Sequence, residues 1–175
     1  MKLSYAAAIL FFLFTSSHGV GQSLNTIIKD PDLNNKEVMV GKCNRTGLQK
    51  GEYGAYFNSQ YEVYKPSDKY IEKMKTKINL VDITVVLGTW CSDSKIQVGR
   101  FFKVLDLSGY NDKRMTIIGV SRKKQAFTTN IENLGIDLVP TFIIYQNGNE
   151  LGRIVESPKR SLERDLAKII NKAKL

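Results

Sequence analysis

Histidine is nearly absent from this sequence. The chain has a single one, His18, and it lies among the first twenty residues. If that segment is removed as a leader, no histidine remains for a Cys-His catalytic pair or a histidine-bound metal, which disfavours a thiol protease. No glycine-rich phosphate loop occurs either, so nucleotide use is not expected. Asp82 and Asp93 lack a third ligand at a suitable spacing. We therefore expect no metal and no other cofactor.

The sequence also lacks an apolar run of the ~20 residues that a membrane span requires. The shorter run from Ala6 to Phe14 follows Lys2 and precedes small residues that include Gly19 and Gly21. This order is typical of a secretory signal, so we expect residues 1–21 to be a signal peptide. An uncleaved anchor is the alternative. Export across the inner membrane to the periplasm or beyond follows from the first interpretation.

Acidic residues are outnumbered, with 17 Asp and Glu against 26 Lys and Arg, a formal charge of +9. The chain has no zinc-finger spacing and no aromatic RNA-binding motif, so nucleic acid is not an expected partner. The basic residues are scattered along the chain. They are consistent with solubility or with weak contact with anionic surfaces, and both interpretations stay open. The oligomeric state cannot be read from this pattern.

Cysteine is scarce: the chain has two, Cys43 and Cys91. Cys91 follows an apolar β-type run and precedes an amphipathic segment, so it is expected where a strand turns into a helix. The first-turn N–H groups and the helix dipole favour a thiolate at such a place. Three residues later stands Ser94, so no Cys-x-x-Cys disulfide can form. Redox chemistry here is either monothiol or uses Cys43, with which an oxidising compartment permits a disulfide.

The length and the 42% hydrophobic content predict one domain. A strand over 83–87, a helix over 95–107 and a strand over 115–120 predict a right-handed parallel crossover. A helix is expected around 126–134. Two antiparallel strands, 142–145 and 151–155, should follow, joined by the turn Asn147-Gly148. A last amphipathic helix is marked by Leu162, Leu166, Ile169 and Ile170.

The amino-terminal part is less regular. Residues 22–35 are polar and resemble a leader without a core of its own. A short strand over 37–41 follows, and the aromatic residues of 53–64 recur as one packing face of a helix would. A second helix is expected to start at 66–68. These elements predict an α/β fold with a mixed sheet, helices on both faces and a helical N-terminal extension over 22–65.

The segment Trp90-Cys91-Ser92-Asp93-Ser94, together with Val139-Pro140-Thr141 and the Asn147-Gly148 hairpin, resembles the thioredoxin superfamily over about 83–175. More narrowly, residues 88–94 and 153–158 resemble exported thioredoxin-like proteins of the Bacteroidetes type. The resemblance implies a thioredoxin fold with a thioredoxin-like domain over 66–175.

The resemblance also implies roles for single residues. Cys91 matches the attacking cysteine of the family, and Trp90 matches the aromatic residue that shields this cysteine. Pro140 matches the cis-proline, and the preceding Val139 is expected to line the bound substrate. A trans proline that starts an edge strand is the alternative. The pattern departs from the family at Ser94, in place of the resolving thiol, and at Val85, in place of a buried Asp. Ser94 is still able to hydrogen-bond to the Cys91 sulfur.

Three functions remain open from the sequence. The first is thiol-disulfide exchange through Cys91 alone, acting on protein thiols or disulfides in cell-envelope redox homeostasis. The second is a dithiol variant in which Cys43 resolves the mixed disulfide. The third is a thioredoxin-fold binding module that holds a protein partner beside Pro140, with Cys91 as an inert residue.

Overall fold

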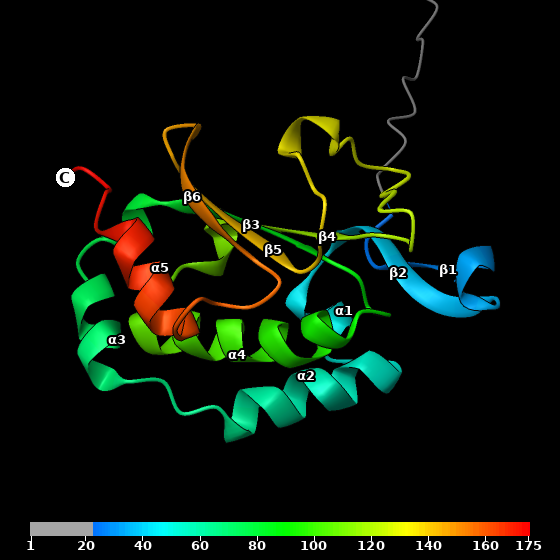
Figure 1. Ribbon diagram of the computed structural model, residues 1–175, viewed down its shortest axis with the longest axis horizontal. Helices are drawn as coiled ribbons and strands as arrows, with labels where there is room; N and C mark the ends of the chain where they lie inside the picture. The colour runs from blue at the N-terminus through cyan, green and yellow to red at the C-terminus, as the bar shows by residue number, and fades with distance from the viewer. Residues whose placement is uncertain (1–22) are drawn as a thin grey trace, which may run out of the picture.

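The computed structural model describes residues 23–175, and the predicted signal peptide lies outside the described residues. The chain forms a six-stranded mixed sheet in the order β1-β2-β4-β3-β5-β6 (Figure 1). β3 and β4 run parallel, and the other neighbouring strands run antiparallel. The strands span Thr26–Asp30 (β1), Lys36–Cys43 (β2), Asp82–Leu87 (β3), Met115–Gly119 (β4), Thr141–Gln146 (β5) and Asn149–Val155 (β6).

All five α-helices of the described chain pack on one face of this sheet (Figure 1). α4 lies between the sheet and α2, because Phe101 stacks on Phe142 of β5 and the next residue, Phe102, contacts Phe57 of α2. This packing forms the larger of two apolar clusters. The helices span Arg45–Leu48 (α1), Gly51–Val63 (α2), Asp68–Met74 (α3), Ser92–Ser108 (α4) and Leu162–Ile170 (α5). Short 3-10 helices span Pro31–Leu33 (η1), Ile78–Leu80 (η2) and Asp112–Arg114 (η3).

The opposite face is covered by residues 120–140, which contain the 3-10 helix η4 (Glu132–Leu134). The predicted α-helix around 126–134 is wrong. Phe127 has a left-handed backbone, with φ +58°, and the Thr128 N–H donates to the carbonyl of Ala126 at 2.7 Å. An α-helix needs a negative φ at every residue, so the positive φ of Phe127 interrupts the helical backbone and no helix propagates through this segment. The segment nonetheless buries Ala126 against the sheet.

The N-terminal part of the described chain is built into the same sheet and core. Residues 26–30 are not a leader without a core but the edge strand β1, which pairs with β2. β2 in turn pairs with β4, and Leu48 of α1 and Phe57 of α2 are completely buried in the larger cluster. The segment predicted as an extension therefore supplies two strands and two helices to the domain.

Most of the remaining helices and strands agree with those predicted from the sequence. The parallel β3–α4–β4 crossover and the β5–β6 hairpin are confirmed. Asn147 and Gly148 have φ +50° and +77°, and the tight hairpin turn they form needs positive φ at both positions. The α/β fold class is also confirmed, with the α-helices on one face and η4 on the other. Within residues 23–175, no helix is long and apolar enough to cross a bilayer.

Candidate functional site

Cys91 lies at the turn between β3 and α4, as the sequence predicted. It is the N-cap residue of α4, and as a residue it is intermediate between buried and exposed. Its N–H donates to the carbonyl of Gly88 at 2.9 Å, and its carbonyl accepts the N–H of Lys95 at 3.0 Å. The sulfur therefore lies at the positive end of a seventeen-residue helix, where negative charge is stabilised.

Val139 and Pro140 lie beside this thiol although they are far away in the sequence. The Cys91 Sγ donates a hydrogen bond to the carbonyl of Val139 at 3.0 Å. The Val139–Pro140 peptide bond is cis, and both residues are buried. Their position follows from the sheet, because β3 pairs with β5 and Val86 is opposite Thr141. The backbone before β5 is thereby held over the start of α4.

Trp90 forms one wall of the site. Its Nε1 donates to the carbonyl of Val120 at 2.9 Å, and the guanidinium of Arg122 lies 4.7 Å from its ring centroid. The ring also lies close to Gly88, where an added Cβ would come within 2.6 Å of it. Gly88 is therefore required for the ring to fold back over the turn. Both Trp90 and Cys91 pack against the smaller apolar cluster.

Ser94 is fully buried and holds the turn in place. Its Oγ accepts the Gly88 N–H at 3.3 Å, and its carbonyl accepts the hydroxyl of Tyr53 at 3.0 Å. In the described part of the chain, its hydroxyl is joined to Gly88 and not to the sulfur of Cys91. Ser94 thus positions the strand-to-helix turn rather than contacting the thiol.

Cys43, the predicted resolving residue, is in a different environment. It is 7% exposed on β2, and its Sγ donates to the carbonyl of Gly41 at 3.3 Å. Burial raises the pKa of the Cys43 thiol to about 11. Both cysteines are free thiols. Burial, with smaller contributions from the nearby Cys91 and Cys43, raises the pKa of the Tyr53 hydroxyl.

Val85 occupies the position where the resembled family has a buried Asp. It is completely buried in β3, opposite Ile117 of β4 and Phe142 of β5. An apolar side chain there cannot transfer a proton. Within residues 23–175, no three His, Cys, Asp or Glu side chains are grouped as metal ligands would be.

Two contacts of the site were not predicted from the sequence. Tyr53 was interpreted as part of an aromatic packing face, and nothing local indicated its bond to Ser94. The Thr89 Oγ1 accepts the N–H of Met39 at 3.1 Å, which ties the turn to β2. A cavity of about 530 Å³ lies here, lined by Tyr53, Thr89 and Trp90 among other residues. It also involves β1, so it could not be found without the long-range pairing of that strand.

Comparison with known proteins gives neighbours by structure only. No protein-family model matches the chain, and no curated protein matches it. A crystallised HIV epitope-scaffold is 19% identical, with a TM-score of 0.50, over 69% of this chain and 83% of its own. A protein of unknown function from Pseudomonas aeruginosa is 17% identical, with a TM-score of 0.47, over 67% and 79%. Thioredoxin O2 from Arabidopsis thaliana is 16% identical, with a TM-score of 0.38, over 61% and 86%.

The strand order and the pairing of β3, β4, β5 and β6 make the fold thioredoxin-like. The β3–α4–β4 crossover, the β5–β6 hairpin and the final helix α5 have the order of a thioredoxin fold, and Cys91 lies at its strand-to-helix turn. A thioredoxin-like fold alone does not specify a reaction, so function has to be argued from the residues around Cys91.

Proposed function

We propose that this protein is an exported thiol-disulfide exchange protein that acts through Cys91 alone on protein thiols or disulfides of the cell envelope. The observation that carries the proposal is the position of the Cys91 thiol. Cys91 is partly exposed at the amino end of α4, and its Sγ lies 3.0 Å from the carbonyl oxygen of Val139, beside the cis bond to Pro140.

The exchange needs one external co-reactant. The Cys91 thiolate attacks one sulfur of a substrate disulfide, a Cys91–substrate disulfide forms, and the other substrate sulfur leaves as a thiolate. A thiolate from a second thiol compound or protein then attacks the substrate sulfur of this mixed disulfide. It forms a new disulfide with the substrate and releases Cys91 as a thiolate. The two steps leave the number of disulfides unchanged, and the buried Ser94 has no part in bond exchange.

Apolar side chains around the thiol support a protein substrate. Leu138, directly before Val139, is 45% exposed, and Val155, which pairs with Thr141, is 40% exposed. Leu138 adjoins the residue whose carbonyl accepts the thiol, and Trp90 packs with Cys91 against the smaller apolar cluster, so apolar side chains lie next to the residues that hold the thiol. Such surface suits an extended, unfolded segment of a protein, since burying it removes apolar area from water.

The alternative is a binding module that uses the same surface without chemistry. It is favoured by one observation: the Cys91 thiol already donates a hydrogen bond to Val139 and packs against the smaller apolar cluster. Exchange and binding differ in whether the complex with the partner protein depends on the Cys91 sulfur. A binding module keeps its partner when Cys91 becomes Ala, whereas an exchanger loses the covalent complex.

Trapping of partner proteins tests the proposal. We expect mixed disulfides with cell-envelope proteins, seen on non-reducing gels, to be abolished by Cys91→Ala and to remain with Cys43→Ala. An increase with Cys43→Ala would assign Cys43 the resolving role. Complexes that survive Cys91→Ala and disappear with Cys43→Ala would reverse the assignment of the attacking thiol.

A further inference from the structure

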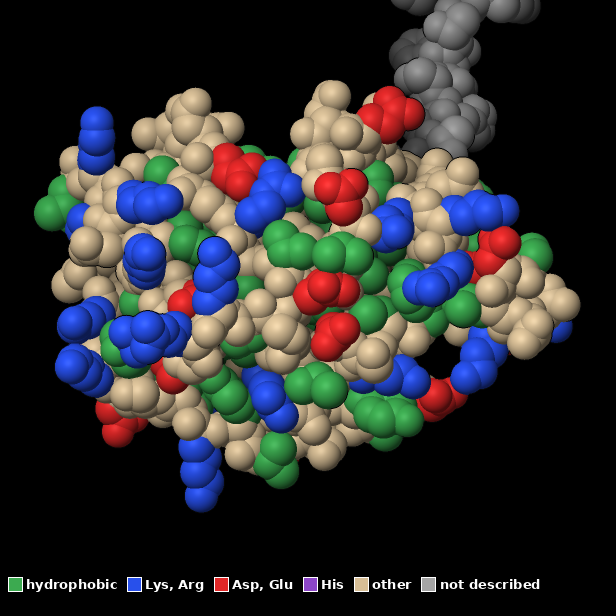
Figure 2. Space-filling model, in the orientation of Figure 1, with side chains coloured by type: hydrophobic (Ala, Val, Ile, Leu, Met, Phe, Trp, Pro, Cys, Tyr) green, Lys and Arg blue, Asp and Glu red, His purple; other side chains and the backbone are tan. Residues whose placement is uncertain are grey.

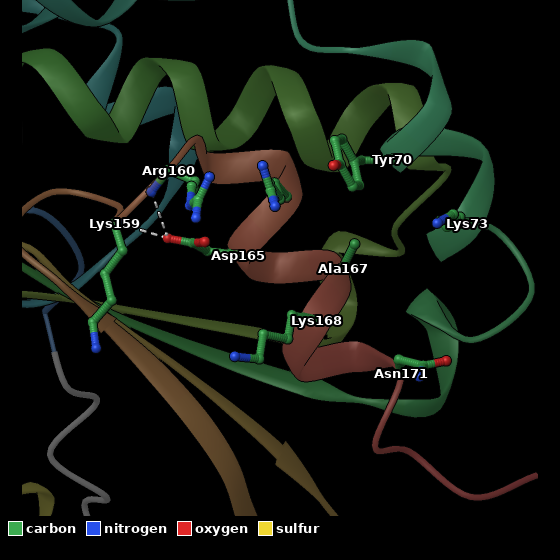
Figure 3. Close-up of a pocket in the computed structure, with 9 residues that line it drawn as sticks. Tyr70, Lys73, Lys159, Arg160, Asp165, Ala167, Lys168 and Asn171 are labelled. Carbon is green, nitrogen blue, oxygen red and sulfur yellow. Dashed lines mark hydrogen bonds between the residues drawn. The ribbon is translucent and has the colours of Figure 1, made fainter.

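A second cavity lies between α3 and α5, away from the residues of the Cys91 site. It has a volume of about 680 Å³ and is lined by α3, by the loop that precedes α5 and by α5 itself. Figure 3 shows Tyr70 and Lys73 of α3 on one side and, on the other, Lys168 of α5 and Asn171, which directly follows α5. We call it the α3–α5 cavity. None of its lining residues contributes to the site around Cys91.

The charges that line the α3–α5 cavity are almost all positive. One acidic residue, Asp165, is present, and its Oδ2 already accepts the backbone N–H of Lys159 at 2.6 Å and of Arg160 at 3.2 Å (Figure 3). Five basic side chains against one acid give the lining a net charge of +4. The basic residues are Lys73, Lys159, Arg160, Arg164 and Lys168.

The five cavity cations are grouped around one cavity and, like most basic residues of the described chain, have no carboxylate partner. Arg45, Arg114 and Arg153 each form an ion pair with a carboxylate. Within residues 23–175, no carboxylate lies within ion-pair distance of any of the five cavity cations. Figure 2 shows Lys and Arg side chains gathered on the side of the molecule that carries α3 and α5. Their charge is therefore available to a ligand.

An aromatic ring forms part of the wall. The Lys73 ammonium lies 5.7 Å and the Arg164 guanidinium 5.9 Å from the ring centroid of Tyr70. Contacts of this kind hold cations over a ring and lower the entropy lost when they bind an anion. Two of the five cations are Arg, whose planar guanidinium binds two phosphate oxygens at once.

We propose that the α3–α5 cavity binds a phosphate-bearing anion that carries two or more negative charges. Such a group occurs in soluble phosphates and in anionic lipid headgroups, and the chemistry of recognition is the same for both. The inference is independent of the reaction at Cys91.

Titration with inorganic pyrophosphate tests the proposal, with heat of binding as the readout. The double variant Arg164→Gln/Lys168→Gln removes two exposed cavity cations. The control variant, Lys29→Gln/Lys42→Gln, removes the same charge from exposed residues of β1 and β2. We expect binding to weaken by about tenfold or more in the cavity variant and by less than about twofold in the control. Equal weakening in both would mean that net charge alone attracts the anion, which would overturn the proposal.

Vesicles distinguish the two sources of the phosphate group. Vesicles of phosphatidylglycerol are compared with vesicles of phosphatidylcholine by sedimentation of the bound protein. Retention on phosphatidylglycerol that the cavity variant loses and the control keeps would assign the ligand to a lipid headgroup. Binding of pyrophosphate without retention on vesicles would assign it to a soluble phosphate. Failure of the wild-type protein to bind either probe would overturn the proposal.

Discussion

Cys91 and Cys43 have the same side chain in two environments. Cys91 is partly exposed at the amino end of α4, whereas Cys43 is buried in β2, where burial raises the pKa of its thiol to about 11. At pH 7 the Cys43 thiol is therefore protonated and shielded, and a protonated thiol does not react as a nucleophile.

The native protein should thus be alkylated at Cys91 alone. With iodoacetamide at pH 7, we expect peptide mass spectrometry to find Cys91 labelled and Cys43 unlabelled until the chain is denatured. The labelling of Cys43 should rise only as the pH approaches about 11. Labelling of native Cys43 at a rate equal to that of Cys91 would contradict the buried position of Cys43.

Substitution of Ser94 offers a gain-of-function test of the Cys91 site. Its Oγ is buried beside Gly88, one helical turn into α4, at the position where a resolving thiol would stand. We expect Ser94→Cys to install or strengthen dithiol reductase activity, because the second sulfur can attack the mixed disulfide within the molecule. The measurement is turnover of a generic disulfide with a regenerating reductant. Unchanged turnover with a reactive Cys91 would indicate that Val85 or the apolar surroundings limit the reaction instead.

The position of a functional residue could be predicted from the sequence where it depends only on neighbouring residues. The strand-to-helix position of Cys91 follows from the apolar run before it and the amphipathic run after it. The hydrogen bond between Tyr53 and Ser94 was not predictable, because it joins two helices whose approach depends on the packing of Phe57 against Phe102. The buried environment of Cys43 likewise depends on the pairing of β2 with β4.

The packing of three helices depends on one carboxylate, that of Asp106. Asp106 of α4 accepts two hydrogen bonds from the Arg45 guanidinium of α1, at 2.8 and 2.6 Å, and one from the Tyr61 hydroxyl of α2, at 2.6 Å. Burial opposes the charge, but these bonds outweigh burial and lower the pKa of Asp106. The cluster fixes the N-terminal helices on α4.

Asp106→Asn should therefore destabilise the fold. We expect the free energy of unfolding to fall by ~1–3 kcal/mol, because a half-buried guanidinium loses its closer charged partner and keeps only Asp112, at 3.7 Å. Urea denaturation followed by circular dichroism measures this change. Glu62→Gln, an exposed change on α2, is the control and should alter the free energy by less than ~0.5 kcal/mol. Equal effects of the two substitutions would show that the Asp106 cluster does not hold the helices.

Two elements show where local patterns mislead. Residues 126–134 have apolar residues at helical spacing, yet Phe127 is in a left-handed turn and the Asn130 side chain accepts the Glu132 N–H at 2.9 Å. Local bonds of Asn compete with a helix in this way. β1 was missed for the opposite reason: only Ile27 and Ile28 are apolar there, and the strand depends on its pairing with β2.

At the scale of the whole molecule, acid should destabilise the protein. Besides Asp106, hydrogen bonds from Arg153 lower the pKa of Glu150, and the bonds made by Glu163 outweigh its burial and lower its pKa. A carboxylate with a lowered pKa binds protons more weakly in the folded chain than in the unfolded chain. Its stabilising contribution is complete above the ordinary pKa, 3.8 for Asp and 4.5 for Glu, and is lost as the pH falls through the lowered pKa.

We therefore expect the midpoint of urea unfolding to be nearly constant from pH 7 to about 5 and to fall steadily below it. The high positive charge of the chain, +9 at pH 7, adds repulsion as further carboxylates are protonated. A midpoint that stays constant down to about pH 3 would contradict the contribution of these three carboxylates.

The reactivity of the Cys91 thiol in the folded protein decides between exchange and binding. The most direct measurement is the rate at which the Cys43→Ala variant, whose single thiol is Cys91, forms a mixed disulfide with glutathione disulfide at pH 7. The same variant unfolded in urea gives the reference rate. We expect the folded protein to react at least about tenfold faster, because the positive end of the α4 dipole favours the thiolate form of the attacking sulfur. A folded rate equal to or below the unfolded rate would contradict the exchange function and favour a binding module.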